Sequence, residues 1–247
     1  HLSLRRQRQM CIRDRIKFAL DKATEFGAEY AEVRLVSITD SSVSTRDGQL
    51  ERAIPGQEVG ATMRILADGA WGVHSTTDIS SIPLQVESTV KLARAVASRR
   101  GIKDKPVSLA EVPIIEDSIH WNPSKDVRNT ELDEKLEHLK VLHENSSDDK
   151  KIASVICGWH DEHIHTEFMS SEGMNRVWSF QRSLVNATVT ARDGSDVVSY
   201  RTRHGGEGGL ELIEACDLAE LGNNAKTSAI RLLKKACRRP HHTAREF

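Results

Sequence analysis

Residues 42–75 read SVSTRDGQLERAIPGQEVGATMRILADGAWGVHS, and this stretch decides the fold. It holds two Asp-Gly pairs, Asp47-Gly48 and Asp68-Gly69, and each pair stands between two runs of extended character. Asp-Gly favours a tight hairpin turn because both central turn positions need a positive φ. The stretch therefore predicts two consecutive hairpins, whose extended runs are residues 42–46, 49–53, 59–67 and 70–75.

Helical periodicity lies on both sides of these hairpins. Apolar residues recur at helical spacing over residues 16–23, and Gly27 stands where such a helix would stop. Residues 30–35 alternate as a half-buried strand does, and residues 82–97 return to helical spacing after a serine pair at 80–81 that can cap a helix. The first part of the chain therefore predicts a helix, a meander of about five strands and a second helix.

A second set of elements follows a connector that contains three prolines. A helix is expected from a cap at Asn129-Thr130, with an apolar stripe made of Leu132, Leu136 and Leu139. Extended runs are expected next, at residues 152–158, 163–170, 176–191 and 196–203, and a last helix at residues 218–235. The predicted fold class is α+β, with two small units that each pack helices on an antiparallel β-meander.

The composition limits which partners the chain can have. A chain of 247 residues can bury a core without disulfides or a structural metal. Its formal net charge is -1, so charge gives no case for binding nucleic acid or an acidic membrane surface. Aromatic residues make up 4%, which argues against a surface for base stacking. No run approaches the length of apolar sequence that a membrane-spanning helix requires.

The cysteines and the chain ends complete this picture. The four cysteines, at positions 11, 157, 216 and 237, form no C-x-x-C pair, so reduced thiols in a cytoplasmic protein are expected. Residues 1–15 are basic and lack the apolar segment of a signal peptide, and we interpret them as a non-native or disordered leader. Residues 237–247 show no periodicity and are expected to be an aberrant or disordered tail.

Histidines and carboxylates supply few candidates for chemistry. His163 and His165 would share one face of a strand, a spacing that can supply two zinc ligands, with His160 close by. A polar face at a turn between exposed strands is the favoured interpretation of this segment, and the pair Asp161-Glu162 is expected in a solvated turn. We assign no catalytic residue and no metal ligand in this chain.

The glycine-rich run at residues 204–209 is a further candidate. It lacks the lysine and the serine or threonine of a P-loop, so a nucleotide site is disfavoured. Glycines let a bound backbone come near because they carry no Cβ. The residues expected to line a substrate path are therefore Gly205, Gly206, Gly208 and Gly209.

Several blocks, in order and spacing, resemble the TldD/PmbA family. The first domain of that family is resembled by GAEYAEVR at 27–34, RDGQLE at 46–51 and DGAWGVHST at 68–76. The middle domain is resembled by SEG at 171–173, VTARDG at 189–194 and GGEGGLE at 205–211. The resemblance covers about residues 16–236. It places the first domain at 16–102 and the middle domain at 103–236.

The resemblance implies a function. TldD members are zinc metallopeptidases. The sequence of residues 68–72 resembles TldD-type members more than PmbA-type members. The implied protein is a cytoplasmic hydrolase that acts on unfolded peptides in a dimeric chamber, as a homodimer or as a heterodimer with a PmbA-type subunit. The family's zinc helix, H-E-x-x-x-H, has no match in this chain. The chain is therefore expected to be a fragment that carries no zinc and is inactive by itself.

Two other functions stay open at this point. The chain can belong to a PmbA-type partner subunit that shares the fold without catalysing proteolysis. It can also be a stand-alone module that holds an extended peptide on a sheet edge. In either case the expected partner is a peptide or a second subunit of the family, and neither nucleic acid nor a membrane is expected.

Overall fold

The computed structural model describes residues 2–99 and 106–236, with side chains from residue 12 onward. The chain divides into two compact units, each assembled from three stretches of sequence. The first unit comprises His1–Ile38, Gln57–Trp121 and Ile164–Ser179. The second unit comprises Thr39–Gly56, Asn122–His163 and Phe180–Phe247. The expected tail, residues 237–247, lies outside the described residues.

Seven strands form one sheet within the described residues. In chain order they are β1 (Tyr30–Arg46), β2 (Gln49–Ala67), β3 (Ala70–Thr76), β4 (Glu116–His120), β5 (Ile152–Ser170), β6 (Asn175–Asp193) and β7 (Asp196–Glu207). The strand order is β3-β2-β1-β5-β6-β4, and β7 also pairs with β6. Strand β3 is antiparallel to β2 and β7 is antiparallel to β6, whereas β4 runs parallel to β6. The expected α+β class, with helices on antiparallel strands, is confirmed.

Helices and two 3₁₀ turns accompany these strands. They are α1 (Leu2–Glu25), η1 (Ile79–Ser81), α2 (Ile82–Ala97), η2 (Val127–Asn129), α3 (Leu132–Ser147), α4 (Leu210–Glu214) and α5 (Leu218–Ala236). Helix α1 begins at Leu2, ahead of Ile16, where the sequence pattern placed its start. In the part of the chain that the structure describes, no helix is both long and apolar enough to cross a membrane.

The two Asp-Gly turns form as predicted. Asp47 and Asp68 have φ angles of 50° and 52°, and the glycines that follow them, Gly48 and Gly69, have 80° and 74°. Positive φ at both central positions is typical of the tight hairpin turn that matches the twist of paired strands. These two turns connect β1 to β2 and β2 to β3.

The first part of the chain forms three strands, two of them 17 and 19 residues long, where about five short ones were expected. Strand β2 continues through Pro55 and Gly56, at which the sequence pattern broke. Strand β3 pairs with residues 61–67 of β2 only, so Pro55 lies beyond that pairing. At this position β2 has only β1 as a neighbour, and an edge position of this kind is where sheets tolerate proline. Strand continuity is therefore set by the neighbouring strand and not by the local sequence.

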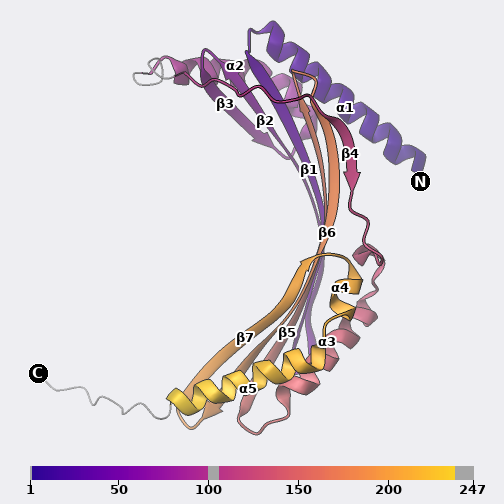
Figure 1. Ribbon diagram of the computed structural model, residues 1–247, viewed down its shortest axis with the longest axis vertical. Helices are drawn as coiled ribbons and strands as arrows, with labels where there is room; N and C mark the ends of the chain where they lie inside the picture. The colour runs from indigo at the N-terminus through magenta and orange to yellow at the C-terminus, as the bar shows by residue number, and fades with distance from the viewer. Residues whose placement is uncertain (1, 100–105, 237–247) are drawn as a thin grey trace, which may run out of the picture. The chain divides into compact units, whose positions relative to one another are not determined.

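The first unit packs its helices through small and aliphatic side chains. Helices α1 and α2 contact each other, and α2 also packs on β3 (Figure 1). The buried core of this unit draws on α1, α2, β1 and β2 and includes Ile16, Leu20, Ala23, Val33, Met63, Ile65, Val86, Val90 and Ala93. Helix α1 ends at Glu25, and Gly27 follows with a φ of 80°, as its position predicted.

An ion pair joins α1 to β5 within the first unit. Arg13 Nε lies 2.7 Å from Glu167 Oε2, and the Glu167 side chain is only 4% exposed. Burial opposes ionisation of this carboxyl group, but hydrogen bonds from His165 and Arg13 outweigh it. The pKa of Glu167 therefore lies below its ordinary value.

Replacing Arg13 with alanine is expected to lower the free energy of unfolding at neutral pH by about 1 kcal/mol, because Glu167 loses a charged donor. A depressed folded-state pKa stabilises the fold above the unfolded pKa of glutamate, and this contribution is lost as the pH falls through the folded pKa. Urea unfolding at about pH 7 and about pH 3 should show the difference shrinking in acid. Lys17→Ala, at an exposed position of the same helix, is the control. An equal loss at both pH values would contradict the prediction.

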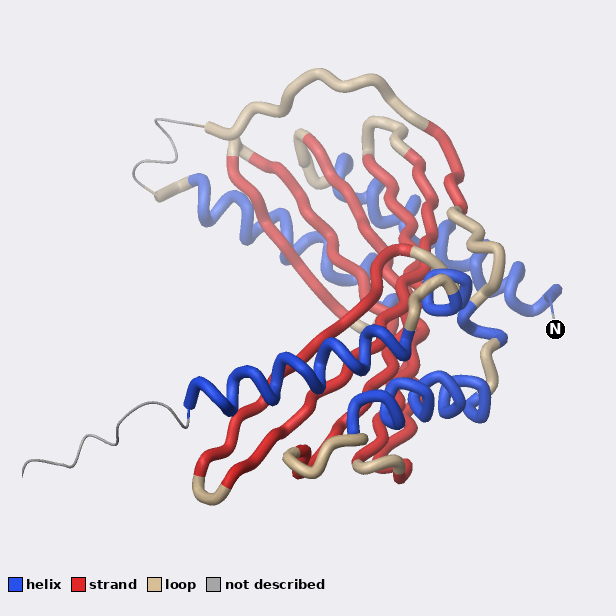
Figure 2. The backbone as a smooth tube through the Cα atoms, turned by 60° about the horizontal axis from the view of Figure 1, so that its bottom comes forward, coloured by secondary structure: helices blue, strands red, loops and turns tan. Residues whose placement is uncertain are grey.

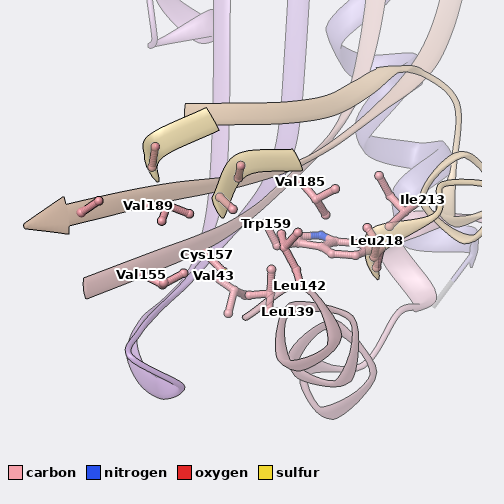
Figure 3. Close-up of a cluster of buried hydrophobic side chains, with 14 of the residues drawn as sticks. Val43, Leu139, Leu142, Val155, Cys157, Trp159, Val185, Val189, Ile213 and Leu218 are labelled. Carbon is pink, nitrogen blue, oxygen red and sulfur yellow. The ribbon is translucent and has the colours of Figure 1, made fainter. Parts of the chain in front are cut away.

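The second unit packs its three helices on one face of its strands. Helices α3 and α5 contact each other, and α5 packs on β7; Figure 2 shows both helices on the same side of these strands. Trp159 of β5 lies in the middle of the buried cluster, among Leu142 of α3, Ile213 of α4 and Leu218 of α5 (Figure 3). The opposite face of β5, β6 and β7 carries polar side chains, among them Glu162, Arg182 and Arg203.

Helix α3 buries a stripe that differs from the expected one. The expected stripe was Leu132, Leu136 and Leu139, whereas the buried residues are Lys135, Leu139, Leu142 and Ser146. Leu132 is 39% exposed. The expected cap is also wrong, because Asn129 ends η2, Thr130 follows it, and Glu131 precedes α3 without a side-chain cap. Lys135 could not be predicted as a core residue because its partner, Asp161, belongs to strand β5, which follows later in the chain.

Candidate functional site

A cavity of about 500 Å³ lies on the polar face of the second unit. The odd-numbered residues of β6 from Gln181 to Ala191 are buried toward the helices, so the even-numbered ones point to the opposite face. Three strands line the cavity from that face, with His160 and Glu162 on β5, Arg182 and Leu184 on β6, and Arg203 and Gly205 on β7. We call it the Arg203 cavity. Its volume falls in the range of sites that bind small molecules or parts of larger ones.

The strand register explains why this face is hollowed here. Across β6 and β7, Leu184 pairs with Gly205, while the neighbouring same-face pairs are Arg182 with Glu207 and Asn186 with Arg203. The Leu184–Gly205 pair has no side chain on its β7 half. The Leu184–Gly205 pair therefore rises less from the sheet than the polar pairs on either side of it, and it forms the floor of the cavity.

Strand β5 closes the other side of the cavity. Glu162 Oε1 lies 3.3 Å from Arg182 Nη1, and the Gly158 carbonyl oxygen lies 3.4 Å from Asn186 Nδ2. His160 lies midway between Gly158 and Glu162 on the same strand, and it lines the cavity together with Leu184. The floor residues Leu184 and Gly205 are thus flanked by an imidazole.

The two arginines of the cavity differ in their partners. Arg182 lies 3.3 Å from Glu162 and 3.6 Å from Glu207. The Arg203 side chain makes no hydrogen bond or ion pair with any residue that the structure describes, and the same holds for the side chain of His160. The Arg182 end is therefore neutralised by carboxylates, whereas no described residue supplies a counter-charge at the Arg203 end.

The glycines expected to line a substrate path fall into two groups. Gly205 and Gly206 line the Arg203 cavity, whereas Gly208 and Gly209 are not among its lining residues. A Cβ on Gly205 would lie 2.4 Å from the Ser183 carbonyl oxygen, and one on Gly209 would lie 1.9 Å from that of Lys125. Both positions require glycine for close backbone packing. The substrate-lining role stays a prediction.

The segment from His160 to His165 lies within the continuous strand β5, so the turn expected there is wrong. The ring of His165 stacks on that of His120 in the first unit, with centroids 6.4 Å apart. Among the side chains described in residues 12–99 and 106–236, no three or more of His, Cys, Asp and Glu are grouped so that they could hold a metal ion. The described donors therefore do not fit a zinc ion, and the zinc implied for the full-length protein stays a prediction.

Asp161 is buried in β5 and not solvated in a turn, which corrects the expectation for the pair Asp161-Glu162. Its side chain is 6% exposed, and its Oδ2 accepts hydrogen bonds from Lys135 Nζ at 2.6 Å, Ser41 Oγ at 2.8 Å and Trp159 Nε1. Lys135 Nζ also lies 2.6 Å from Ser41 Oγ. We call these four residues the Lys135–Asp161 network.

A serine beside a lysine can act as a nucleophile when the lysine is neutral and takes the hydroxyl proton. In this network the Lys135 ammonium is ion-paired with the Asp161 carboxylate, at 2.6 Å. A charged ammonium has no lone pair with which to accept a proton. The arrangement of Ser41 and Lys135 is therefore structural.

The two described cysteines are not activated nucleophiles. Burial raises the pKa of the Cys157 thiol to about 12. Burial, together with the neighbouring Asp217 and Glu220 carboxylates, raises the pKa of Cys216. Reactive cysteines have a lowered pKa instead. Both thiols are free, as expected for reduced cysteines.

Sequence reasoning missed Arg182 and Arg203. The signal available was the alternation of Val185, Ala187 and Val189 with polar residues, which marks a solvated face of the sheet. Arg182 belongs to that face by parity. Only the β6–β7 register shows that Arg203 shares the same cavity.

Comparison with known proteins gives the family. Residues 31–97 match a family model described as PmbA/TldA metallopeptidase domain 1. Residues 125–233 match the model of the PmbA/TldA metallopeptidase central domain. The two matches follow each other in the order of the domains and together cover most of the chain.

Individual relatives agree with these matches. A metalloprotease of Methanothermobacter thermautotrophicus is 28% identical over 206 residues, which is 83% of this chain and 44% of that protein. A zinc metalloprotease TldD homolog of Saccharolobus solfataricus is 25% identical over 180 residues, or 72% of this chain and 38% of that protein. The chain thus spans less than half the length of these curated relatives.

A solved structure shows the same fold. The protein comes from Bacteroides thetaiotaomicron and is described as a candidate modulator of DNA gyrase; its TM-score is 0.68 at 20% identity. The match covers 89% of this chain and 49% of the other. With both domain models matched in order, this chain belongs to the PmbA/TldD family of metallopeptidases.

Proposed function

We propose that this chain supplies the first and central domains of a TldD-like zinc metallopeptidase that hydrolyses unfolded peptides inside a dimeric chamber. The observation that carries the proposal is the ordered match of both domain models, at residues 31–97 and 125–233. The relatives named metalloprotease and zinc metalloprotease TldD homolog support this class of activity. The proposed location is the cytoplasm, and the proposed partner is a second copy or a PmbA-type subunit.

In this proposal the domains described above build a scaffold and a surface that meets the peptide. In the proposal the zinc is held by residues outside this chain, because the family's zinc helix, H-E-x-x-x-H, has no match in its sequence. A catalytic zinc site needs three protein ligands and an open position. The chain by itself is therefore proposed to be inactive.

The purified 247-residue chain is expected to retain no stoichiometric zinc after dialysis and to cleave no fluorogenic peptide in a chelator-sensitive way. Metal analysis by mass spectrometry and a peptidase assay with and without chelator check this. One zinc retained per chain, and lost on His163→Ala, would contradict the proposal by placing the metal on these domains. A His74→Ala variant, in which a histidine of the other unit is changed, serves as the control.

Zinc content of the full-length protein separates the two family subtypes. About one zinc per subunit supports the metallopeptidase, since a single catalytic ion suffices for hydrolysis of a peptide bond. A full-length protein that binds none, yet forms a stable complex with a zinc-bearing family member, would establish the PmbA-type partner subunit in its place.

A further inference from the structure

We propose that the Arg203 cavity binds a carboxylate group of the peptide substrate. The inference rests on the proposed function, since it names the chemistry by which this unit would hold a peptide. Its starting point is the contrast between the two arginines, of which only Arg182 is neutralised by carboxylates. A guanidinium that has no counter-charge among the described residues, next to a hollow of about 500 Å³, is a binding group for an anion.

A second cavity in the molecule contains an arginine whose guanidinium is already bound by other side chains. In the first unit, a cavity of about 280 Å³ is lined by Arg64, Glu32 and Trp71, among others. The Arg64 guanidinium lies 3.0 Å from Glu32 Oε1 and 4.2 Å from the centroid of the Trp71 ring. Its charge is already used by the protein. Arg203 lacks any such partner among the described residues, so it remains available for a ligand.

The floor of the cavity leaves room for the group that Arg203 would bind. Gly205 stands two residues along β7 from Arg203 on the same face, and no side chain rises from it. A carboxylate resting there can accept two parallel hydrogen bonds from a guanidinium. The imidazole of His160, which also has no partner among the described residues, stands across Leu184 and offers a further donor.

The other end of the cavity limits the charge of the ligand. Glu162 and Glu207 flank Arg182, and their two carboxylates would repel a ligand that carried several negative charges. A carboxylate carries one charge and can stay at the Arg203 end. The geometry therefore favours a carboxylate over a phosphate or a nucleotide.

The carboxylate can come from the C-terminus of a peptide or from an acidic side chain, and three probes distinguish these sources. They are an N-acetylated glycine–alanine peptide with a free C-terminus, its C-terminal amide, and the amide with a central glutamate. Titration into the full chain is followed by ¹⁵N NMR at the Gly205 and Gly206 amides. The test variant is Arg203→Ala. The matched control is Arg201→Ala, since Arg201 is also exposed on β7 and has no described partner, but does not line the cavity.

Binding of at least one carboxylate-bearing peptide is expected, with the amide about tenfold weaker or not bound. Arg203→Ala should remove this preference, whereas Arg201→Ala should retain it. If the amide and the acids bind alike, or if both variants behave alike, the carboxylate inference is overturned while the proposed peptidase function stands. If no peptide perturbs these amides, both the inference and the proposed contact of this unit with peptide fail. The variants' ¹⁵N spectra show whether each remains folded.

Discussion

Lys135→Met is expected to lower the free energy of unfolding by about 3–5 kcal/mol. The Lys135 ammonium is buried, and it lies 2.6 Å from Asp161 and 2.6 Å from Ser41. Methionine fills a similar volume but leaves the Asp161 carboxylate buried without a counter-charge. A buried charge without its partner is far more costly than the pair itself. Urea unfolding followed by tryptophan fluorescence measures the loss.

Two further variants separate charge from packing. Lys140→Met changes an exposed lysine of the same helix and is expected to alter stability by no more than about 0.5 kcal/mol. The double variant Lys135→Met with Asp161→Asn removes both charges but keeps an oxygen that can accept from Trp159 and Ser41. It should be more stable than Lys135→Met alone. A double variant that is less stable would show that the buried charge is not the source of the loss.

Gly72→Val is expected to lower the free energy of unfolding of the first unit by about 3 kcal/mol, although valine favours strands more than glycine does. Gly72 lies in β3 beneath α2, and a Cβ at this position would stand 2.3 Å from the Thr89 carbonyl oxygen and 3.1 Å from the Ala93 nitrogen. Both are backbone atoms of the helix, so no side-chain rotation relieves the clash. The helix must move away from the sheet and lose buried contacts.

Gly60 supplies the matched control in the neighbouring strand. A Cβ at Gly60 would lie 3.8 Å from the nearest backbone atom, the Thr76 carbonyl oxygen, which is an ordinary contact distance. Gly60→Val is therefore expected to change stability by about 0.5 kcal/mol or less. Thermal unfolding of both variants gives the comparison. Equal losses at the two positions would mean that chain stiffness, and not the approach of α2, decides the cost.

The carboxylate site and the buried network could not be read from the sequence for one shared reason. Arg182 and Arg203 lie far apart in the chain, and only the register of β6 on β7 brings them to one cavity. Lys135 and Asp161 are likewise joined only when α3 packs over β5. A charged residue in a polar stretch looks solvated until its partner from another element is known. The expectation of a solvated turn at Asp161 failed on this point.

The sequence alone predicts the two hairpin turns, the bounds of α2 and the family. Asp-Gly pairs impose positive φ wherever they stand, and so Asp47-Gly48 and Asp68-Gly69 placed two hairpin turns correctly. The apolar spacing of residues 82–97 placed α2 at its observed bounds. Ordered blocks of sequence identified the PmbA/TldD family, which the domain matches confirm.

Only the tertiary structure decided how far each strand runs and which polar groups are buried. Strand β2 passes through Pro55, and β5 passes through the expected turn, because pairing with neighbours outweighs a weak local preference. Burial of Lys135 with Asp161, and exposure of Arg203 without a partner, depend on contacts between residues distant in the chain. The backbone preference of a residue depends mainly on its neighbours in the sequence. The free energy of a buried or unpaired charge depends instead on all the groups that surround it in the folded protein.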